Sequence, residues 1–394
     1  MAHVVMAWEL GAGYGHLAPL LSLARPLQEA GHDVSFVVRD VVAAEAVLAG
    51  SGMPFYPAPA NFRPTGGADL HSYPQILLGT AFNREDELGA RVRAWRSLLQ
   101  ALQPDVLVAD HAPTALLAAR GTDFPCVVTG NGFVVPPDVS PLPELRPWAP
   151  ADQRVLEQAE AEALERANRA AQRAGSPTLT RLADLYAEAA PALFTFRELD
   201  NYAGLRKDAA YWGTLPGPGG AAPPWPSGAG KRVFLYGHLF ESLPQVLKSL
   251  SKGPHRTLAQ VPRLPPDLRR HASAHLAFAD ALLDMAAVTR ECDAAVMTSG
   301  HSTTAAMLLA GKPLVLLPQY LEMLLIARSV EAQGAGLSAP MLKPEGILGK
   351  LERVLSEPQF AEKARAFAAA HAEWDPAIPV TNFGALVTRL AAER

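Results

Sequence analysis

The chain has 394 residues, of which 49% are hydrophobic and 19% charged, and its formal net charge is −4. A chain of this length usually exceeds what one hydrophobic core supports, so two domains are expected. The composition is typical of a soluble globular protein. The slightly negative charge argues against nucleic acid or an acidic membrane surface as the main partner.

The two cysteines, Cys126 and Cys292, each lie in an apolar or strand-like segment. A disulfide framework is therefore not expected, and a reducing compartment is the simpler interpretation. No apolar segment reaches the roughly 18 residues of a membrane span, and no basic region precedes the first apolar run. We expect a cytoplasmic protein with no transmembrane segment, and the sequence leaves the oligomeric state open.

The N-terminal residues predict one β-α-β unit. Residues 4–7 form an apolar run, a glycine-rich stretch follows, and leucines and alanines then recur at helical spacing up to Gly31. Residues 34–38 predict the second strand. Pro26 interrupts the helical stretch, so a kink or an early break is expected there. His16 therefore lies at a turn between a strand and a helix.

The remainder of the first half continues the alternation of strands and helices. Residues 105–109 and 124–129 predict strands, and Asp110 and His111 directly follow the first of them. Residues 152–190 predict one or two amphipathic helices, which could form a lid over a substrate cleft or simply cover the sheet. We expect a first domain over residues 1–212, with this helical insert at about 150–190.

The second half repeats the organisation of the first. Residues 213–230 contain little except Gly, Pro, Ala and Trp, a composition that predicts an interdomain linker. A second domain is expected over residues 231–377, with predicted strands at 232–236 and 294–297. Strands that alternate with helices indicate the α/β class, with doubly wound parallel sheets.

Two turns have the composition of ligand loops. In open α/β sheets, ligands bind outside the carboxyl ends of the strands, where a helix start offers unpaired N–H groups. The glycines at 11–15 follow the first strand, and the Ser- and Thr-rich turn 298–304 has donors suited to a diphosphate. Structural alternatives stay open at this point, because glycines occur in ordinary turns and Ser and Thr are preferred N-cap residues.

Taken together, these segments resemble the family 1 inverting glycosyltransferases of the GT-B superfamily, which include bacterial natural-product enzymes and UDP-sugar enzymes of plants and animals. The acceptor-side signature of that family is matched by Gly11-x-Gly13-x-Gly15-His16-x-x-Pro19 and by Leu23-Ala24-x-x-Leu27-x-x-x-Gly31-His32-x-Val34-x-Phe36. The donor-side signature is matched by Gly300-x-x-Thr303-Thr304, Leu309-Ala310-Gly311-x-Pro313, Leu317-Pro318, Glu322, Ala327, Val330 and Gly334-Ala335-Gly336. The matched segments span nearly the whole chain in the order that the family has.

The resemblance implies a GT-B fold, in which two Rossmann-like domains face each other across a cleft and residues 378–394 form a helix that crosses back to the first domain. It implies inverting transfer of a sugar from a UDP or dTDP sugar to a small-molecule acceptor. His16 would be the general base, and Asp110 would orient it. No metal is implied, and no cofactor beyond the nucleotide sugar as co-substrate.

The resemblance also implies the residues that hold the two substrates. Donor-binding residues would be Gly13, Gly237, Thr298, Ser299, Gly300, His301, Ser302, Thr303, Thr304 and Glu322. Acceptor contacts are expected from Tyr14, His111, Phe82 and Phe133, although scattered aromatic residues more often belong to the core.

The chain departs from the family pattern on the donor side. The phosphate-binding histidine of the family falls at Thr298, the following glycine at Ser299, and a glutamine at Met323. Threonine donates one hydrogen bond but carries no positive charge, and methionine hydrogen-bonds sugar hydroxyls poorly. We hypothesise that His301 or His238 supplies the missing cationic donor.

Two other functions fit the same architecture, since a fold does not fix an activity. One is a sugar-nucleotide epimerase or hydrolase, and the presence of both His16 and Asp110 argues against it. The other is a non-catalytic homologue that binds a partner transferase, which the residues Thr298 and Met323 motivate.

Overall fold

The structure, a computed structural model, describes residues 1–11, 14–60, 70–215, 217 and 219–393. The chain forms two compact units, and each is described by itself. The first comprises Met1–Pro216 together with Pro376–Arg394, and the second comprises Gly217–Asp375. The second unit thus begins inside the stretch predicted as a linker. No helix among the described residues is long and apolar enough to cross a membrane.

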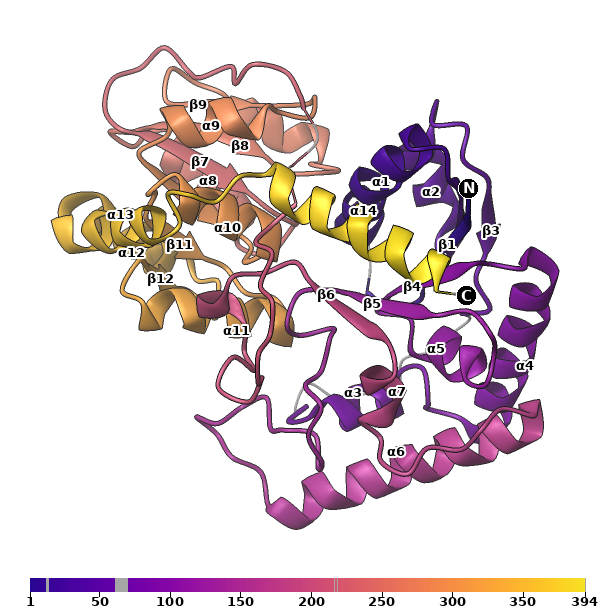
Figure 1. Ribbon diagram of the computed structural model, residues 1–394. Helices are drawn as coiled ribbons and strands as arrows, with labels where there is room; N and C mark the ends of the chain where they lie inside the picture. The colour runs from indigo at the N-terminus through magenta and orange to yellow at the C-terminus, as the bar shows by residue number, and fades with distance from the viewer. Residues whose placement is uncertain (12–13, 61–69, 216, 218, 394) are drawn as a thin grey trace. The chain divides into compact units, whose positions relative to one another are not determined.

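The first unit is built on a six-stranded sheet in which every pairing is parallel, with the strand order β3-β2-β1-β4-β5-β6 (Figure 1). Its strands are β1 (His3–Trp8), β2 (Asp33–Val38), β3 (Phe55–Pro57), β4 (Val106–Asp110), β5 (Cys126–Gly130) and β6 (Ala190–Leu193). This is the strand order of the Rossmann fold, in which the order of the strands reverses between β1 and β4. The predicted strands near residues 4, 34, 105 and 124 are all present.

Helices connect these strands. They are α1 (Tyr14–Glu29), α2 (Val41–Leu48), α3 (Tyr73–Gly79), α4 (Glu85–Leu102), α5 (Pro113–Ala119), α6 (Gln153–Ala174) and α7 (Asp184–Ala187), with a short 3-10 helix η1 (Arg197–Leu199). Helix α6 is the amphipathic insert that the sequence predicts. Asp152 caps its N-terminus by accepting from the N–H of Arg154, and Gly175 ends it in the left-handed conformation.

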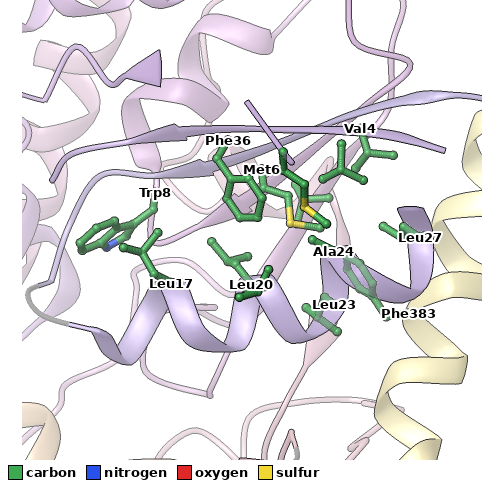
Figure 2. Close-up of a cluster of buried hydrophobic side chains, with 14 of the residues drawn as sticks. Val4, Met6, Trp8, Leu17, Leu20, Leu23, Ala24, Leu27, Phe36 and Phe383 are labelled. Atoms are coloured by element: carbon green, nitrogen blue, oxygen red, sulfur yellow. The ribbon is translucent and has the colours of Figure 1, made fainter. Parts of the chain in front are cut away.

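Helix α1 carries much of the core of the first unit, as Figure 2 shows. Leu20, Leu23 and Leu27 on one face of α1 pack against β1 and β2. Of the two outcomes predicted for Pro26, a kink or an early break, the early break does not occur, because α1 continues to Glu29. Burial of the apolar face outweighs the hydrogen bond that proline removes near the helix end. Gly31, with φ +86°, then reverses the chain.

The C-terminal helix α14 (Ala377–Ala392) belongs to the first unit. It lies alongside α1 (Figure 1). Phe383 and Val387 are fully buried in the same core as Leu20 and Leu23. The Phe383 ring lies 6.1 Å from that of Phe194, which follows β6. The end of the chain is therefore held by aromatic and aliphatic packing on the first unit.

The second unit repeats the topology of the first, with the strand order β12-β11-β10-β7-β8-β9 and parallel pairing throughout. Its strands are β7 (Arg232–Tyr236), β8 (Arg256–Gln260), β9 (Leu276–Phe278), β10 (Ala294–Met297), β11 (Leu314–Leu316) and β12 (Gly336–Ser338). Its helices are α8 (Leu243–Leu250), η2 (Pro266–His271), α9 (Met285–Glu291), α10 (His301–Leu309), α11 (Leu321–Ala332), α12 (Pro344–Ser356) and α13 (Pro358–Ala370).

Part of the predicted linker packs on the second unit. Ala221 forms a bridge with Leu283, and the indole N–H of Trp225 donates to Glu291 at 3.0 Å. The guanidinium of Arg232 lies 5.6 Å from the Trp225 ring centroid. A Gly- and Pro-rich composition therefore does not make this whole stretch a free linker, because one tryptophan and a backbone pairing anchor it.

Candidate active site

The candidate site of the first unit lies at the carboxyl ends of β1 and β4, where the strand order reverses. Trp8 and Asp110, the last residues of these two strands, are register partners across the ladder. The chain leaves β1 and enters α1, whose first turn carries His16. Residues far apart in sequence are thus brought together at the position where open α/β sheets bind ligands.

His16 and Asp110 form a hydrogen-bonded pair. The Nδ1 of His16 lies 3.0 Å from Oδ2 of Asp110, and the two side chains are 18% and 8% exposed. A carboxylate only accepts hydrogen bonds, so the bond places a proton on Nδ1. Nε2 then carries the lone pair of the neutral ring, which is the arrangement that a general base requires.

Gly11 leaves the space that the His16 ring occupies. A Cβ built on Gly11 would lie 2.1 Å from Nε2 of His16, and the φ of Gly11 is +89°. Both facts require glycine at this position. Arg39, which follows β2, fixes the loop by donating from Nη1 to the carbonyl of Gly11 at 2.7 Å. Ala12 and Gly13 lie outside the described residues, as does the side chain of Tyr14.

His111 lies next to the pair in an unusual backbone conformation, with φ +46°. Its carbonyl accepts from the N–H of Leu10 at 3.0 Å, which ties the end of β4 to the end of β1. Burial holds the pKa of His111 well below its ordinary value, and the neighbouring charges of His16 and Arg39 act in the same direction. The ring is therefore neutral at neutral pH, and its buried Nε2 has no hydrogen-bond partner among the described residues.

Aromatic side chains surround His111. Tyr73 at the start of α3 and Phe133 after β5 have ring centroids 6.0 and 6.4 Å from the His111 ring. Phe133 is nearly buried, at 8% exposure. Phe82, a predicted acceptor contact, is fully buried, so its ring is part of the core rather than of an accessible surface.

A buried ion pair holds the loop that carries Phe133. Asp200 accepts from Nε of Arg206 at 2.6 Å, and Nη2 of Arg206 donates to the carbonyl of Gly132 at 3.0 Å. A Cβ on Gly132 would lie 1.8 Å from Oδ1 of Asp200, so glycine is required for this approach. The sequence did not single out this clamp, because Gly132 lies 74 residues before Arg206 in the chain.

Glu9 also lies in this region, and the sequence motifs did not identify it. Its side chain is fully buried behind β1, where it accepts from the indole N–H of Trp95 at 2.6 Å and from the backbone N–H of Thr114 at 2.8 Å. Ala115 N–H donates at 3.3 Å, and the Thr114 hydroxyl also donates. Glu9 thus holds the N-terminus of α5, the helix that begins three residues after Asp110.

Burial raises the pKa of Glu9, although the hydrogen bonds from Thr114, Trp95 and Ala115 act in the opposite direction. The native state therefore binds more protons than the unfolded state between the ordinary pKa of Glu9 and its raised native pKa. Its free energy of unfolding should fall as the pH rises through that window. We expect Glu9→Gln to remove this slope. Denaturant titrations at several pH values measure the difference between the two proteins, and a difference that does not change with pH contradicts the prediction.

In the second unit, the corresponding position lies at the carboxyl ends of β7 and β10. Gly237 directly follows β7, and Thr298 follows β10 and donates its N–H to the carbonyl of Tyr236 at 3.0 Å. A Cβ on Gly237 would lie 2.6 Å from Cγ2 of Thr298. The absence of a side chain at Gly237 therefore permits the close approach of the turn that begins at Thr298.

Helix α10 begins in the predicted donor loop. Gly300 is its N-cap, and His301, Ser302 and Thr303 form its first turn. The hydroxyls of Ser299 and Thr304 are buried and have no hydrogen-bond partner among the described residues. Backbone N–H groups at a helix start and hydroxyl donors are the groups that bind phosphate oxygens.

The segments after β11 and β7 contribute one acidic and one imidazole side chain. Glu322 lies in the first turn of α11 and is half-buried, whereas Met323 beside it is buried in the core. His238 is exposed after β7. Because β7 and β10 are paired, His238 and His301 lie on the same edge of the sheet. The residues predicted for the donor thus share one edge of the second unit, apart from Gly13.

Two other kinds of site, a metal centre and a reactive thiol, can be compared with the described residues. No group of three or more His, Cys, Asp or Glu residues there has an arrangement that would hold a metal ion. Burial raises the pKa of the Cys126 thiol to about 12 and that of Cys292 to about 11. Thiols that stay protonated at neutral pH are poor nucleophiles.

Comparison with known proteins identifies the architecture. No family model matches the sequence, and no curated protein matches it. Among solved structures, the chain is similar to the calicheamicin glycosyltransferase CalG4, at 18% identity and a TM-score of 0.69 over 99% of both chains. The glycosyltransferase VinC in complex with DTDP matches at 18% identity, with a TM-score of 0.68 over 100% of both chains. The chain has the GT-B fold.

The GT-B fold is also that of the spinosyn rhamnosyltransferase SpnG, whose complex with spinosyn aglycone matches at 19% identity. The TM-score is 0.66, over 98% of this chain and 100% of that one. At these identities the likeness establishes the GT-B fold but not the activity. The two units with the same strand order are the two Rossmann-like halves of this fold.

Proposed function

We propose that the protein is an inverting glycosyltransferase that transfers a sugar from a UDP or dTDP sugar to a small-molecule acceptor. The observation that carries the proposal is the hydrogen bond between Nδ1 of His16 and Oδ2 of Asp110. A histidine oriented by a carboxylate at the carboxyl edge of a GT-B sheet is equipped to take a proton from a nucleophile. The calicheamicin glycosyltransferase CalG4 and the spinosyn rhamnosyltransferase SpnG are similar in structure.

In the proposed reaction, Nε2 of His16 accepts the proton of the acceptor hydroxyl as the oxygen bonds to the anomeric carbon. The bond between that carbon and the diphosphate oxygen breaks on the opposite face, so the anomeric configuration inverts. The nucleoside diphosphate leaves with the bonding electrons. Asp110 stabilises the imidazolium that forms, and Nε2 later releases the proton to solvent.

The leaving diphosphate is assigned to the start of α10. The N–H groups of its first turn and the hydroxyls of Ser299, Ser302, Thr303 and Thr304 would stabilise the developing negative charge. Thr298 and Gly300 shape the turn, and Gly237 leaves room for it. His301 or His238 would supply a cationic donor, and Glu322 would accept hydrogen bonds from sugar hydroxyls. This assignment requires no metal.

The acceptor is assigned to the surroundings of His16. Phe133 and His111 would contact it from the end of β5 and the end of β4, and Tyr14 would lie at the start of α1. SpnG has been solved with an aglycone and VinC with DTDP. The SpnG complex supports a small-molecule aglycone as the acceptor. The VinC complex supports dTDP as a candidate nucleotide.

Mass spectrometry tests the proposal. The protein is incubated with UDP-glucose or dTDP-glucose and a panel of hydroxylated polyketide aglycones. We expect a mass gain of one sugar on an acceptor, and proton coupling constants that show the inverted anomer. Release of nucleoside diphosphate without glycosylation would indicate a hydrolase instead. If no UDP or dTDP derivative raises the melting temperature, the non-catalytic homologue is favoured.

A further inference from the structure

Trp8 is a buried aromatic residue that the proposed mechanism does not use. It is the last residue of β1, and its side chain is 0% exposed. The indole N–H donates to the carbonyl of Leu10 at 2.6 Å, and the ring lies in the core beside Leu17 (Figure 2). Because the ring is inaccessible, it does not contact a substrate directly.

The Trp8 indole is stacked on the His16 imidazole. The ring centroids are 5.5 Å apart and the planes are inclined by 21°. This is an offset stack, and its separation falls within the roughly 6 Å at which an aromatic face attracts a cation. A neutral imidazole gains little from the indole quadrupole, whereas an imidazolium gains an electrostatic attraction. The stack therefore favours the protonated form of His16 over the neutral form.

The other charged and titratable groups around His16 come from several elements. Asp110 accepts from Nδ1, and the His111 ring lies 6.1 Å away, where burial keeps it neutral. Arg39 binds the Gly11 carbonyl beside the ring. Glu9 directs its carboxylate away, to α5 and Trp95. Asp110 and the Trp8 face favour the imidazolium, and the Arg39 charge opposes it.

We propose that Trp8 is a positioning residue that fixes the plane of the His16 ring and stabilises the imidazolium formed when His16 takes the proton of the acceptor. The proposal rests on the proposed function only for its catalytic consequence. The indole acts from the face of the ring and Asp110 acts from its edge, so the two residues support His16 in different directions. Their register pairing on β1 and β4 places both at the same level of the sheet.

The test is the titration of His16 in the full chain. Labelling with ¹³C at Cε1 of histidine gives one signal per histidine, and His16→Gln assigns the signal of His16. We expect the titration midpoint to fall from the native protein to Trp8→Phe and further to Trp8→Leu, by about 0.4 to 1.5 pH units in total. An unchanged or raised midpoint in both variants overturns the proposal. Trp8→Phe retains a ring and most of the volume, so it provides the test if Trp8→Leu does not fold.

Kinetics provide the readout that a purely structural role would not move. For a general base, kcat/KM rises with pH through the pKa of the free enzyme. Trp8→Phe and Trp8→Leu should shift this rise to lower pH and reduce its plateau by about two- to thirty-fold. Loss of activity with no shift of the rise contradicts the proposal. Trp212→Phe is the matched control, because Trp212 packs on Phe194 in the same core and should leave the titration unchanged.

The titration of His16 and the assay of sugar transfer test the role of Trp8 and the proposed function separately. If the midpoint of His16 falls as expected but no sugar is transferred to any acceptor, the stack is established and the glycosyltransferase assignment fails. If transfer occurs and depends on His16 while the midpoint stays constant in the Trp8 variants, the function stands and the role of Trp8 is refuted.

Discussion

Replacing His16 with alanine is expected to lower the rate of sugar transfer by about 10³-fold or more, because it removes the general base that the proposed reaction places at the start of α1. Binding of UDP or dTDP should stay within about twofold, since the predicted donor residues other than Gly13 lie in the other unit. Single-turnover kinetics measure the first effect and calorimetric titration the second. Turnover at the native rate would contradict the mechanism.

The variant Asp110→Asn tests the other member of the His16–Asp110 pair. The amide can donate a hydrogen bond to Nδ1, which would place the proton of His16 on Nε2 and remove the base. In comparable Asp–His pairs, this exchange lowers turnover by about 10⁴-fold. Combined with His16→Ala it should add little, because residues that act as a unit are not additive. Additive losses would show that Asp110 acts independently of His16.

Gly11→Ala is expected to reduce transfer by about 10²-fold or more while the protein still folds. The new Cβ would lie 2.1 Å from Nε2 of His16, and the φ of +89° is strained for alanine. The ring or the loop must move, and a shift of about 1 Å at a catalytic group has a cost of this size. The pH dependence of kcat/KM and the His16 signal report the displacement.

Gly15→Ala is the matched control for the stability of this helix start. A Cβ on Gly15 meets nothing within 4 Å, and Gly15 already has helical conformation in the first turn of α1. Alanine should raise the free energy of unfolding by up to about 1 kcal/mol. If Gly11→Ala and Gly15→Ala have the same melting temperature and the same activity, the close approach of Gly11 to His16 is not functional.

Local patterns predicted much of the fold because each depends on neighbours in sequence. Apolar runs predicted the strands, periodic leucines predicted α1, and Asp152 and Gly175 bounded α6. The predicted break at Pro26 failed, because a proline near a helix end costs less than its buried neighbours contribute. Part of the stretch predicted as an interdomain linker packs on the second unit, through the hydrogen bond of Trp225 with Glu291.

The candidate site was only partly accessible to sequence reasoning. His16 and Asp110 stand out because each follows a predicted strand and matches a family signature. Trp8 ends β1 and Glu9 follows it, but an aromatic and an acidic residue at the end of a strand have many structural roles. The signal that could have singled out Glu9 is an isolated carboxylate directly after an apolar run, since a buried charge requires partners.

The sequence by itself determined the class of fold and the two Rossmann-like halves, and it marked candidates for a base and for a phosphate-binding turn. The reason is that helix and strand periods, turn glycines and helix caps are properties of short segments. Only the tertiary structure decided that Trp8 stacks on His16, that Glu9 holds α5, and that Gly11 faces Nε2. The pairing of β1 with β4 brings Glu9 to the start of α5, and the packing of α1 on β1 brings His16 to Trp8 and Gly11. Gly11, the first glycine of the stretch that the sequence marked, is therefore explained by the space that the His16 ring requires.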